Sequence, residues 1–239
     1  MRIAFSANYG VSLTVEGIRI WIDAVHNGVP GVYSPVAPDL FDRMLKSGDF
    51  REPDYLFFTH CHTDHFSKKK AERVREMWPG ARLILPEPRF SDQLLLSGRS
   101  MRFSDRGVEF QFIHLTHEGE QYRDVPHYGL LLKGEGRTVL LAGDCEVCSG
   151  QLEEALRGRH IDTAVLPFPW LTLSRGRTFV RDIIKPDHLV VGHLPFPEDD
   201  RMGYGRAAAL ARKKFGDTTD IRLLTRAMQT EEILPVLRP

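Results

Sequence analysis

Three histidines and an aspartate fall within six residues of the chain, at His60, His62, Asp64 and His65. They follow the apolar run 55–58, which predicts a buried strand whose exit loop carries all four side chains. Because alternate side chains of an extended segment share one side, His60 and His62 can point together, while Asp64 and His65 can turn toward a second point. A lone histidine would indicate only a surface loop. Imidazole and carboxylate groups at this density predict a metal site, and one short loop could serve two ions.

The pattern His60-x-His62-x-Asp64-His65 resembles the HxHxDH signature of the metallo-β-lactamase-fold hydrolases, which is far more specific than a single HxH. The apolar strand predicted over 138–142 is followed by Gly143-Asp144. By itself Asp144 would be a turn residue, but the resemblance implies an aspartate that bridges two ions. Asp23 at the end of an early strand could likewise only cap a turn, whereas the resemblance implies that it braces the metal site from beneath.

The resemblance covers nearly the whole chain and implies a complete set of ligands. The first ion would be held by His60, His62 and His117, and the second by Asp64, His65 and His193, with Asp144 and a water or hydroxide shared between them. The implied fold is α/β (α+β), a four-layer αββα sandwich with two mixed sheets and the metals at one edge between them. Periodicity alone supports only a mixed α/β domain.

Three histidines compete for the remaining place in the first set of ligands. His114 continues the alternating strand 108–113 and is expected to pack within a sheet. His117 lies where that strand gives way to an exit loop, so it is expected to ligate. His127 lies at the opening of the next strand, and we expect it to face a substrate and act in catalysis without binding metal.

The hydrophobic pattern predicts elements along the whole chain. Strands are expected over residues 2–7, 11–16, 18–23, 55–58, 82–85, 108–113, 128–133, 138–142, 163–166, 188–191 and 221–224, the last at a sheet edge. Helices are expected from an Asp39 cap to a stop at Gly48, from Ser67 to 78, from Ser149 to 157, over 179–185, and over 201–215 with Gly216 closing it. Residues 26–38 are expected to form an ordered loop beside the active site.

Length, composition and charge limit the class of protein. A chain of 239 residues with 42% hydrophobic content predicts a single domain over 1–239. The chain has 32 basic residues (Lys and Arg) and 32 acidic residues (Asp and Glu), so its net charge does not favour a polyanion and we do not expect nucleic acid as a partner. Neither a signal peptide nor a bilayer-spanning run is apparent in the sequence, so we expect a cytoplasmic protein without membrane association. The oligomeric state, a homo-oligomer included, is left open.

The chemistry follows from the ions. Metal binding lowers the pKa of water to about 7, which makes hydroxide available as the nucleophile at neutral pH. Asp64 could orient or deprotonate that water, and Asp144 would join the ions. Zinc is the expected metal, with manganese or iron as alternatives. The predicted enzyme is a dinuclear metal-dependent hydrolase acting on a phosphodiester, lactone or thioester.

The loops give fewer clues to the substrate, which we expect to be a small, anionic molecule. Arg175 and Arg177 could grip a phosphate or carboxylate, although surface arginines explain them equally well. The proline-rich segments 167–170 and 194–197 could line a pocket, or serve only as structural loops. The segment from Asp162 to Pro167 shows a short similarity to ascorbate-phosphate lactonase-like members of the family.

Three alternatives remain open. A nuclease of the same fold is the first, and the neutral charge balance weighs against it. A di-iron redox protein of this fold is the second; that branch resembles HxExD, whereas this chain has His62 at the second position. A redox module built on Cys145-x-x-Cys148 is the third, because CxxC at a helix start can lower a thiol pKa. Cys145 packed beside Asp144 is the simpler interpretation, and Cys61, which alternates with His60 and His62, is expected to point away from the metals.

Overall fold

The computed structural model describes residues 1–215 and 219–236 of the chain. Its strands are β1 Arg2–Phe5, β2 Val11–Val15, β3 Ile18–Ile22, β4 Tyr55–Phe57, β5 Arg82–Leu85, β6 Leu94–Leu95, β7 Ser100–Asp105, β8 Val108–His114, β9 Tyr128–Gly134, β10 Arg137–Leu141, β11 Thr163–Pro167, β12 His188–Gly192, β13 Asp220–Leu223 and β14 Thr230–Glu232. Its helices are α1 Pro38–Lys46, α2 Lys68–Met77, α3 Gly150–Leu156, α4 Pro169–Thr172, α5 Ser174–Phe179 and α6 Tyr204–Phe215. Short 3-10 and π-helical turns, η1 Glu120–Tyr122 and η2 Val180–Ile184, complete the described elements.

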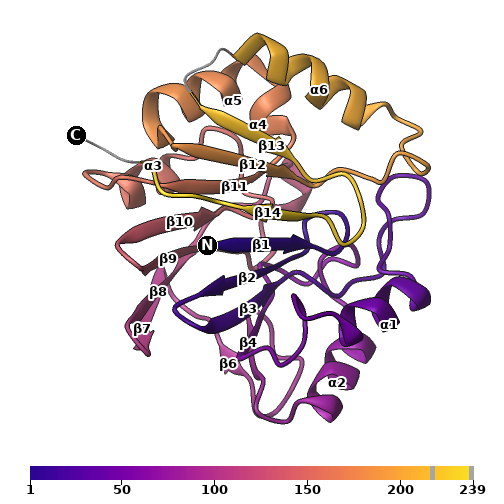
Figure 1. Ribbon diagram of the computed structural model, residues 1–239. Coiled ribbons are helices and arrows are strands. Elements are labelled where there is room, and N and C mark those ends of the chain that lie inside the picture. The colour runs from indigo at the N-terminus through magenta and orange to yellow at the C-terminus, as the bar shows by residue number, and fades with distance from the viewer. Residues whose placement is uncertain (216–218, 237–239) are drawn as a thin grey trace.

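Two seven-stranded mixed sheets make up the centre of the described molecule, and helices flank both of them (Figure 1). The first sheet has the order β14-β1-β2-β3-β4-β5-β6, and the second has the order β13-β12-β11-β10-β9-β8-β7. Helices α1 and α2 lie beside the first sheet, whereas α3 to α6 lie beside the second (Figure 1). The predicted sandwich of two mixed sheets between helices is therefore confirmed.

Strand direction explains why one edge of the sandwich collects the polar loops. β3, β4 and β5 are parallel neighbours, so their carboxyl ends leave the first sheet on the same side. In the second sheet β10, β11 and β12 are parallel, and β8 shares their direction because β8 and β10 are both antiparallel to β9. The loops that follow β4, β8, β10 and β12 can therefore meet.

Two clusters of buried apolar side chains hold the layers together. The larger one joins side chains of both sheets, such as Phe57 and Phe112, whose ring centroids lie 5.0 Å apart, and extends to Leu40 and Val74 on α1 and α2. The smaller one packs α3, α5 and α6 against the second sheet. β10 lies in the middle of the second sheet, as its uniformly apolar sequence predicts, and contributes to both clusters through alternate side chains. In the described part of the chain, no helix has the length and apolar character needed to cross a bilayer.

Several predicted element boundaries need correction. Helix α1 begins after Ala37 with Pro38 in its first turn, so Asp39 lies inside the helix, and Ser47 ends it before Gly48. The helix expected over 179–185 is α5 followed by the π-helical turn, which ends where Lys185 has a φ of 49°. Helix α6 begins at Tyr204, three residues after the expected start. Its predicted stop at Gly216 lies outside the described residues.

The C-terminal segment contains a strand that the sequence pattern did not predict. β13 is an edge strand of the second sheet, as expected, but the chain then crosses to the first sheet. There β14 pairs antiparallel with β1, for example Ile3 with Glu231. The short, exposed β6 was also not predicted. β7 was not predicted either, because its alternating inner face, with Met101 and Phe103, is only half-buried.

Candidate metal centre

Seven side chains from four loops converge at the edge where the strands end. His60, His62 and His117 form one group, and Asp64, His65, Asp144 and His193 form a second, with potential ligand atoms of each group within 4.8 Å of one another. The loop after β4 supplies four of them, and the loops after β8, β10 and β12 supply the others. The structure thus brings together every residue predicted to ligate metal. It places Asp144 in the second group, with its Oδ2 3.9 Å from His117 Nε2 of the first.

In the first group, hydrogen bonds fix which imidazole nitrogen faces the centre. Thr59 Oγ1 donates to Asp23 Oδ2 at 2.7 Å, so it accepts from His60 Nδ1 at 3.0 Å. His117 Nδ1 donates to the carbonyl oxygen of Glu118 at 2.7 Å. Each ring thereby keeps a lone pair on Nε2, and these two Nε2 atoms lie only 3.3 Å apart. Two facing lone pairs repel unless a cation lies between them.

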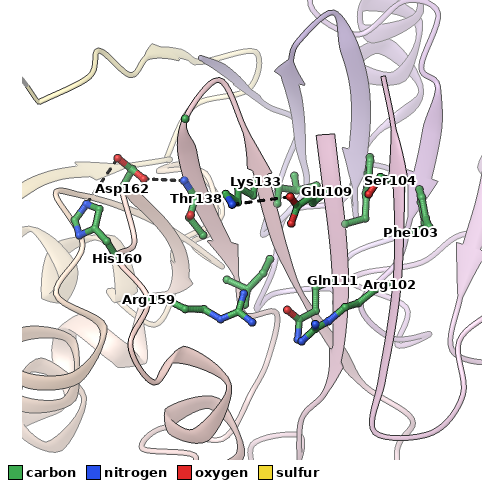
Figure 2. A pocket seen from close by; sticks show the side chains of 14 residues that line it. Arg102, Phe103, Ser104, Glu109, Gln111, Lys133, Thr138, Arg159, His160 and Asp162 are labelled. Atoms are coloured by element: carbon green, nitrogen blue, oxygen red, sulfur yellow. Dashed lines mark hydrogen bonds and ion pairs between the residues drawn. The ribbon is translucent and has the colours of Figure 1, made fainter. Parts of the chain in front are cut away.

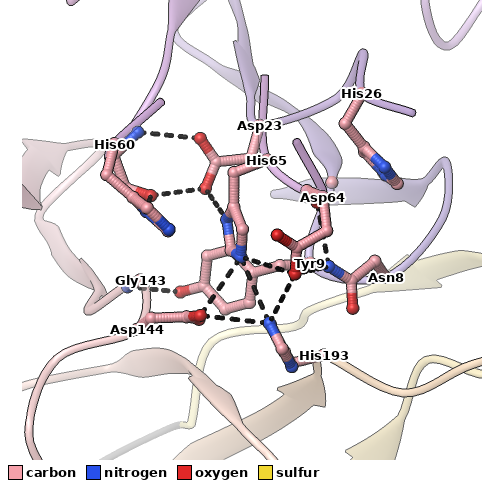
Figure 3. Close-up of polar contacts among 12 residues, drawn as sticks. Asn8, Tyr9, Asp23, His26, His60, Asp64, His65, Gly143, Asp144 and His193 are labelled. Carbon is pink, nitrogen blue, oxygen red and sulfur yellow. Dashed lines mark hydrogen bonds and ion pairs between the residues drawn. The ribbon is translucent and has the colours of Figure 1, made fainter. Parts of the chain in front are cut away.

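The second group repeats this arrangement. His65 Nδ1 donates to Asp23 Oδ2 at 2.8 Å, which leaves His65 Nε2 3.1 Å from His193 Nε2 (Figure 3). Asp144 Oδ2 lies 3.1 Å from His193 Nε2 and 3.3 Å from His65 Nε2. Asp64 Oδ2 lies 3.5 Å from His193 Nε2. Imidazole nitrogens and carboxylate oxygens at this density are the donors expected for a divalent ion.

Electrostatics within the second group favour a bound cation. Burial opposes ionisation of Asp144, but His193 and His65 outweigh burial and hold the pKa of Asp144 well below its ordinary value. Burial would lower the pKa of His65, yet Asp144 and Asp64 outweigh it and raise that pKa. The metal-free group therefore compensates its carboxylates with protonated imidazoles, and a divalent ion can take the place of those protons. The buried Oδ1 of Asp144 has no hydrogen-bond partner among the described residues and is free to accept one more contact.

Asp23 holds the two groups in register from below, as the family resemblance implied. Its carboxylate is completely buried and accepts from the Thr59 backbone NH at 2.7 Å, in addition to Thr59 Oγ1 and His65 Nδ1. One carboxylate thus orients a histidine of the second group directly and His60 of the first group through Thr59 (Figure 3).

Further buried supports were missed by the sequence analysis. Asn8 Nδ2 donates to the backbone oxygen of Asp64 at 2.9 Å, and the backbone oxygen of Asn8 accepts from His193 N at 2.6 Å. The Tyr9 hydroxyl accepts from Gly143 N at 3.0 Å and donates to Val165 O at 2.7 Å. The available signal in the sequence was an asparagine directly after the strand predicted over 2–7, and the structure gives Asn8 a φ of 53°, a conformation that asparagine tolerates.

The prediction that His127 faces a substrate is wrong. Its ring is completely buried and lies behind His60, with ring centroids 5.3 Å apart, and its Nδ1 contacts the backbone oxygen of Leu115 at 3.2 Å. His127 belongs to neither ligand group and is not part of the wall of the cleft. Position at the start of a strand did not reveal on which side of the ligand loop the ring would lie.

A cleft of about 350 Å³ opens over the two ligand groups. Tyr33 from the loop 26–38, Tyr122 from η1, and Trp170 from α4 contribute its aromatic walls. Pro167 and Pro169 also line it, so the segment 167–170 borders the cleft, whereas the described lining includes no residue of 194–197.

Of the two interpretations left open for Arg175 and Arg177, the structure favours surface arginines over a grip on the substrate. Arg175 forms an ion pair with Glu118 at 3.2 Å, and Arg177 Nη1 donates to the backbone oxygens of Leu171 and Thr172 at 3.1 and 2.7 Å. Neither arginine lines the cleft.

The three cysteines do not behave as a redox pair or as ligands. Cys145 is buried in the core and Cys148 is exposed, and burial raises the pKa of both thiols. The structure therefore supports packing rather than a thiol of lowered pKa. Cys61 lies outside both ligand groups, as predicted, and burial raises its pKa to about 12.

A larger cavity, of about 620 Å³, lies along strands β7 to β10 of the second sheet (Figure 2). None of the seven potential metal ligands lines it. Its wall mixes charges, with Arg102, Lys133 and Arg159 beside Glu109 and Asp162. It borders a third, more exposed group of His160, Asp162 and Asp187. In that group Asp162 already accepts from Thr138 N at 2.7 Å, and His160 pairs with Asp187 at 3.0 Å. Among the described residues, the buried potential ligands therefore converge at the smaller cleft.

Comparisons with known proteins agree with this geometry. The chain resembles the metallo hydrolase Igni18 from the archaeon Ignicoccus hospitalis with a TM-score of 0.66 and 15% identity over 96% of this chain and 97% of that one. It resembles an isothiocyanate hydrolase from Delia radicum gut bacteria with a TM-score of 0.69 and 15% identity over 97% and 98%. CmlA, a diiron β-hydroxylase from Streptomyces venezuelae, has a TM-score of 0.69 and 17% identity, but the match covers 98% of this chain and only 54% of CmlA. At these identities the likeness concerns the fold.

The sequence itself provides the assignment to a family. No curated protein matches the chain. A sequence model of the family described as the beta-lactamase superfamily domain, however, matches residues 18–195, which include β3 to β12 and all seven side chains of the metal centre. The chain therefore belongs to the beta-lactamase superfamily, and its fold is that of the metallo-β-lactamase-fold metal-dependent hydrolases.

Proposed function

We propose that this protein is a hydrolase that holds two divalent metal ions, zinc in the first place and manganese or iron as alternatives, and cleaves an ester-type bond of a small molecule. The observation that carries the proposal is the pair of facing Nε2 contacts, His60 with His117 at 3.3 Å and His65 with His193 at 3.1 Å. In three of these four rings Nδ1 is committed to an oxygen, so Nε2 is the atom that faces the centre, where a divalent ion can be bound in place of a proton.

The donor sets support two ions rather than one. Three imidazoles in the first group and two imidazoles with two carboxylates in the second exceed what one tetrahedral site can use. Asp144 is the residue suited to join them, because Oδ2 lies in the second group while Oδ1 is buried without a partner among the described residues. When bound, divalent ions lower the pKa of water to about 7 and polarise an ester oxygen.

The chain's own residues would orient the reactants. Asp64 lines the cleft, and Asn8 Nδ2 fixes its backbone at 2.9 Å, so its carboxylate is positioned at the floor. Burial opposes the ionisation of Asp64, but His65 and His193 outweigh it and lower its pKa, so the carboxylate is ionised at neutral pH and can accept a hydrogen bond that orients water. One wall of the cleft is apolar and would exclude bulk water from the reacting atoms; it is formed by Val147, Pro169 and Trp170.

The test combines metal content with turnover. Elemental analysis of metal-replete protein is expected to give about two ions per chain, and a panel of phosphodiesters, lactones and thioesters is expected to show hydrolysis of at least one class. Asp64→Ala is expected to abolish hydrolysis and to weaken binding of the second ion. Saturation at one ion, or an unchanged rate in the Asp64 variant, would contradict the proposal.

No second function is proposed. The likeness to a diiron hydroxylase concerns the fold, and the cleft provides no feature that favours oxygen chemistry over hydrolysis. A nuclease would need a cationic surface along a strand of nucleic acid. The described lining of the cleft contains no lysine or arginine, so the proposal stays with a small molecule.

A further inference from the structure

The wall of the cleft beyond the metal ligands is almost free of charge. Its residues other than ligands are Val29, Tyr33, Glu118, Tyr122, Cys145, Val147, Pro167, Pro169 and Trp170. Among these described residues Glu118 alone carries a formal charge, and it is held at the rim by two contacts, with Arg175 at 3.2 Å and with the backbone NH of Val147 at 2.6 Å. A substrate group extending away from the ions would therefore meet apolar and aromatic surface.

Two tyrosines place aromatic rings against the two ligand groups. The Tyr122 ring lies 5.0 Å from the His62 ring and 5.1 Å from the His117 ring, so it borders the first group. The Tyr33 ring lies 4.2 Å from the His193 ring and borders the second. Tyr122 is 40% exposed, which leaves part of its ring available to a ligand. The third aromatic residue of the wall is Trp170, which is 1% exposed and whose Nε1 has no partner among the described residues.

Charge on the non-reacting part of a substrate would find no compensation here. Arg175 is bound to Glu118 and Arg177 to backbone oxygens, and the described lining of the cleft contains no arginine or lysine. A carboxylate or phosphate placed beyond the ions would lose its hydration beside Glu118 without gaining an ionic partner. An aromatic ring would bury apolar surface against Tyr122 and Tyr33 instead.

From these observations we propose that the substrate's non-reacting part is uncharged and aromatic or otherwise apolar, and that Tyr122 is a specificity-determining residue that contacts it. This inference rests on the proposed function, because it places the reacting bond at the ions. It replaces the expectation of an anionic substrate. The cleft volume of about 350 Å³ suits a molecule of this kind with a single ring.

Three metal-chelating probes that differ only in their tails test the inference without turnover. Acetohydroxamate, benzohydroxamate and 4-carboxybenzohydroxamate would be titrated calorimetrically into protein of measured metal content, and each Kd would be corrected by the affinity of the probe for free Zn²⁺. Benzohydroxamate is expected to bind about tenfold more tightly than acetohydroxamate, because its ring buries apolar area. The carboxylate tail is expected to weaken binding about fivefold relative to the phenyl tail.

Variants of Tyr122 separate a ring contact from general effects. Tyr122→Leu is expected to reduce the preference for the phenyl tail about fivefold, while the Kd of acetohydroxamate changes less than about twofold. Tyr122→Phe retains the ring and is expected to retain the preference, which distinguishes the ring face from the hydroxyl. Metal content, measured in each variant, shows whether the site itself is intact.

The outcomes distinguish this inference from the proposed function. Two results with metal-loaded protein would overturn the inference and leave the proposed hydrolase function standing. One is that the carboxylate tail binds as tightly as the phenyl tail, and the other is that the phenyl tail binds no more tightly than the methyl tail. An unchanged preference in Tyr122→Leu overturns the role of Tyr122. Protein that takes up no metal and binds none of the probes overturns the proposed function and this inference together.

Discussion

His117 shows at the scale of one residue how the chain prepares a ligand. Its Nδ1 donates to the backbone oxygen of Glu118, and its Nε2 lies 3.3 Å from that of His60. We therefore expect His117→Ala to lower the metal content from about two ions per chain to about one, because the first group keeps only two ligands. Cys61→Ser is the matched control from the same centre, and elemental analysis should show unchanged metal in it. If metal were lost in the Cys61 variant and retained in the His117 variant, Cys61 and not His117 would be a ligand.

Asp23 is expected to affect metal binding indirectly, because it contacts His65 and, through Thr59, His60. Asp23→Asn exchanges one acceptor oxygen for an NH2 group, which would face a donor at Thr59 or His65. We expect metal affinity to fall about 10- to 100-fold, as for other partners of ligating histidines. Competition with a fluorescent chelator measures this change, and Asp42→Asn on the exposed side of α1 provides the control. Equal affinities in the two variants would remove Asp23 from the positioning of the site.

At the scale of elements, Asp200 caps the last described helix. Its two carboxylate oxygens accept from Tyr204 N at 2.8 Å and from Gly205 N at 2.9 Å at the start of α6. We expect Asp200→Ala to lower the free energy of unfolding by about 1 kcal/mol in urea titrations, because two backbone NH groups lose their acceptor. Metal content should not change.

Glu198→Ala, at an exposed position of the same loop, serves as the comparison and is expected to stay within about 0.5 kcal/mol of the parent. If the two variants are equally stable, the cap contributes nothing measurable. The predicted start of α6 was three residues early, because helical periodicity marks the apolar face of a helix and not its first residue. The first residue is set by the carboxylate of Asp200, which accepts from the backbone NH groups of Tyr204 and Gly205.

At the scale of the whole molecule, the metal centre joins loops of both sheets. The loop after β4 belongs to the first sheet, and the loops after β10 and β12 belong to the second. We expect chelation to lower Tm, because ions that bind only the folded chain stabilise it by about 4 kcal/mol at a thousandfold excess over Kd. Differential scanning calorimetry at several free metal concentrations measures this dependence. A Tm that does not change with free metal would show that the ions do not bind the folded chain in preference to the unfolded chain.

The buried His26 gives the fold a dependence on pH. Burial lowers its pKa to about 3, while Nε2 contacts Ala7 O at 3.1 Å and Nδ1 accepts from Gly28 N at 3.1 Å. Between pH 3 and 6.5 the unfolded chain binds a proton at this histidine that the folded chain does not bind, so stability rises with pH through that window and is lost as pH falls.

We expect His26→Asn to remove up to about 1.4 kcal/mol per pH unit from this slope, because one proton no longer distinguishes the two states. Urea unfolding of metal-free protein at several pH values between 4 and 8 provides the measurement. Identical slopes in the parent and the variant would show that other groups set the pH dependence.

The sequence by itself determined the fold class, the order of most elements and the seven side chains of the metal centre. Periodicity indicated a mixed α/β domain and the order of most elements, and the density of histidines over 60–65 indicated a metal site. The αββα sandwich and the full set of seven ligands came from the resemblance of the HxHxDH motif to the metallo-β-lactamase-fold family. Residues 60–65 are separated by so few bonds that their side chains lie near one another wherever the loop is placed.

Only the tertiary structure decided what surrounds those ligands. His127 lies behind His60 instead of in the cleft, and Arg175 is paired with Glu118, because each position depends on how two sheets and their loops pack. The supports from Asn8 and Tyr9, and the pairing of β14 with β1, join segments far apart along the chain. Local periodicity carries no signal for such contacts, since they form only when both partners have already been brought to one edge of the sandwich.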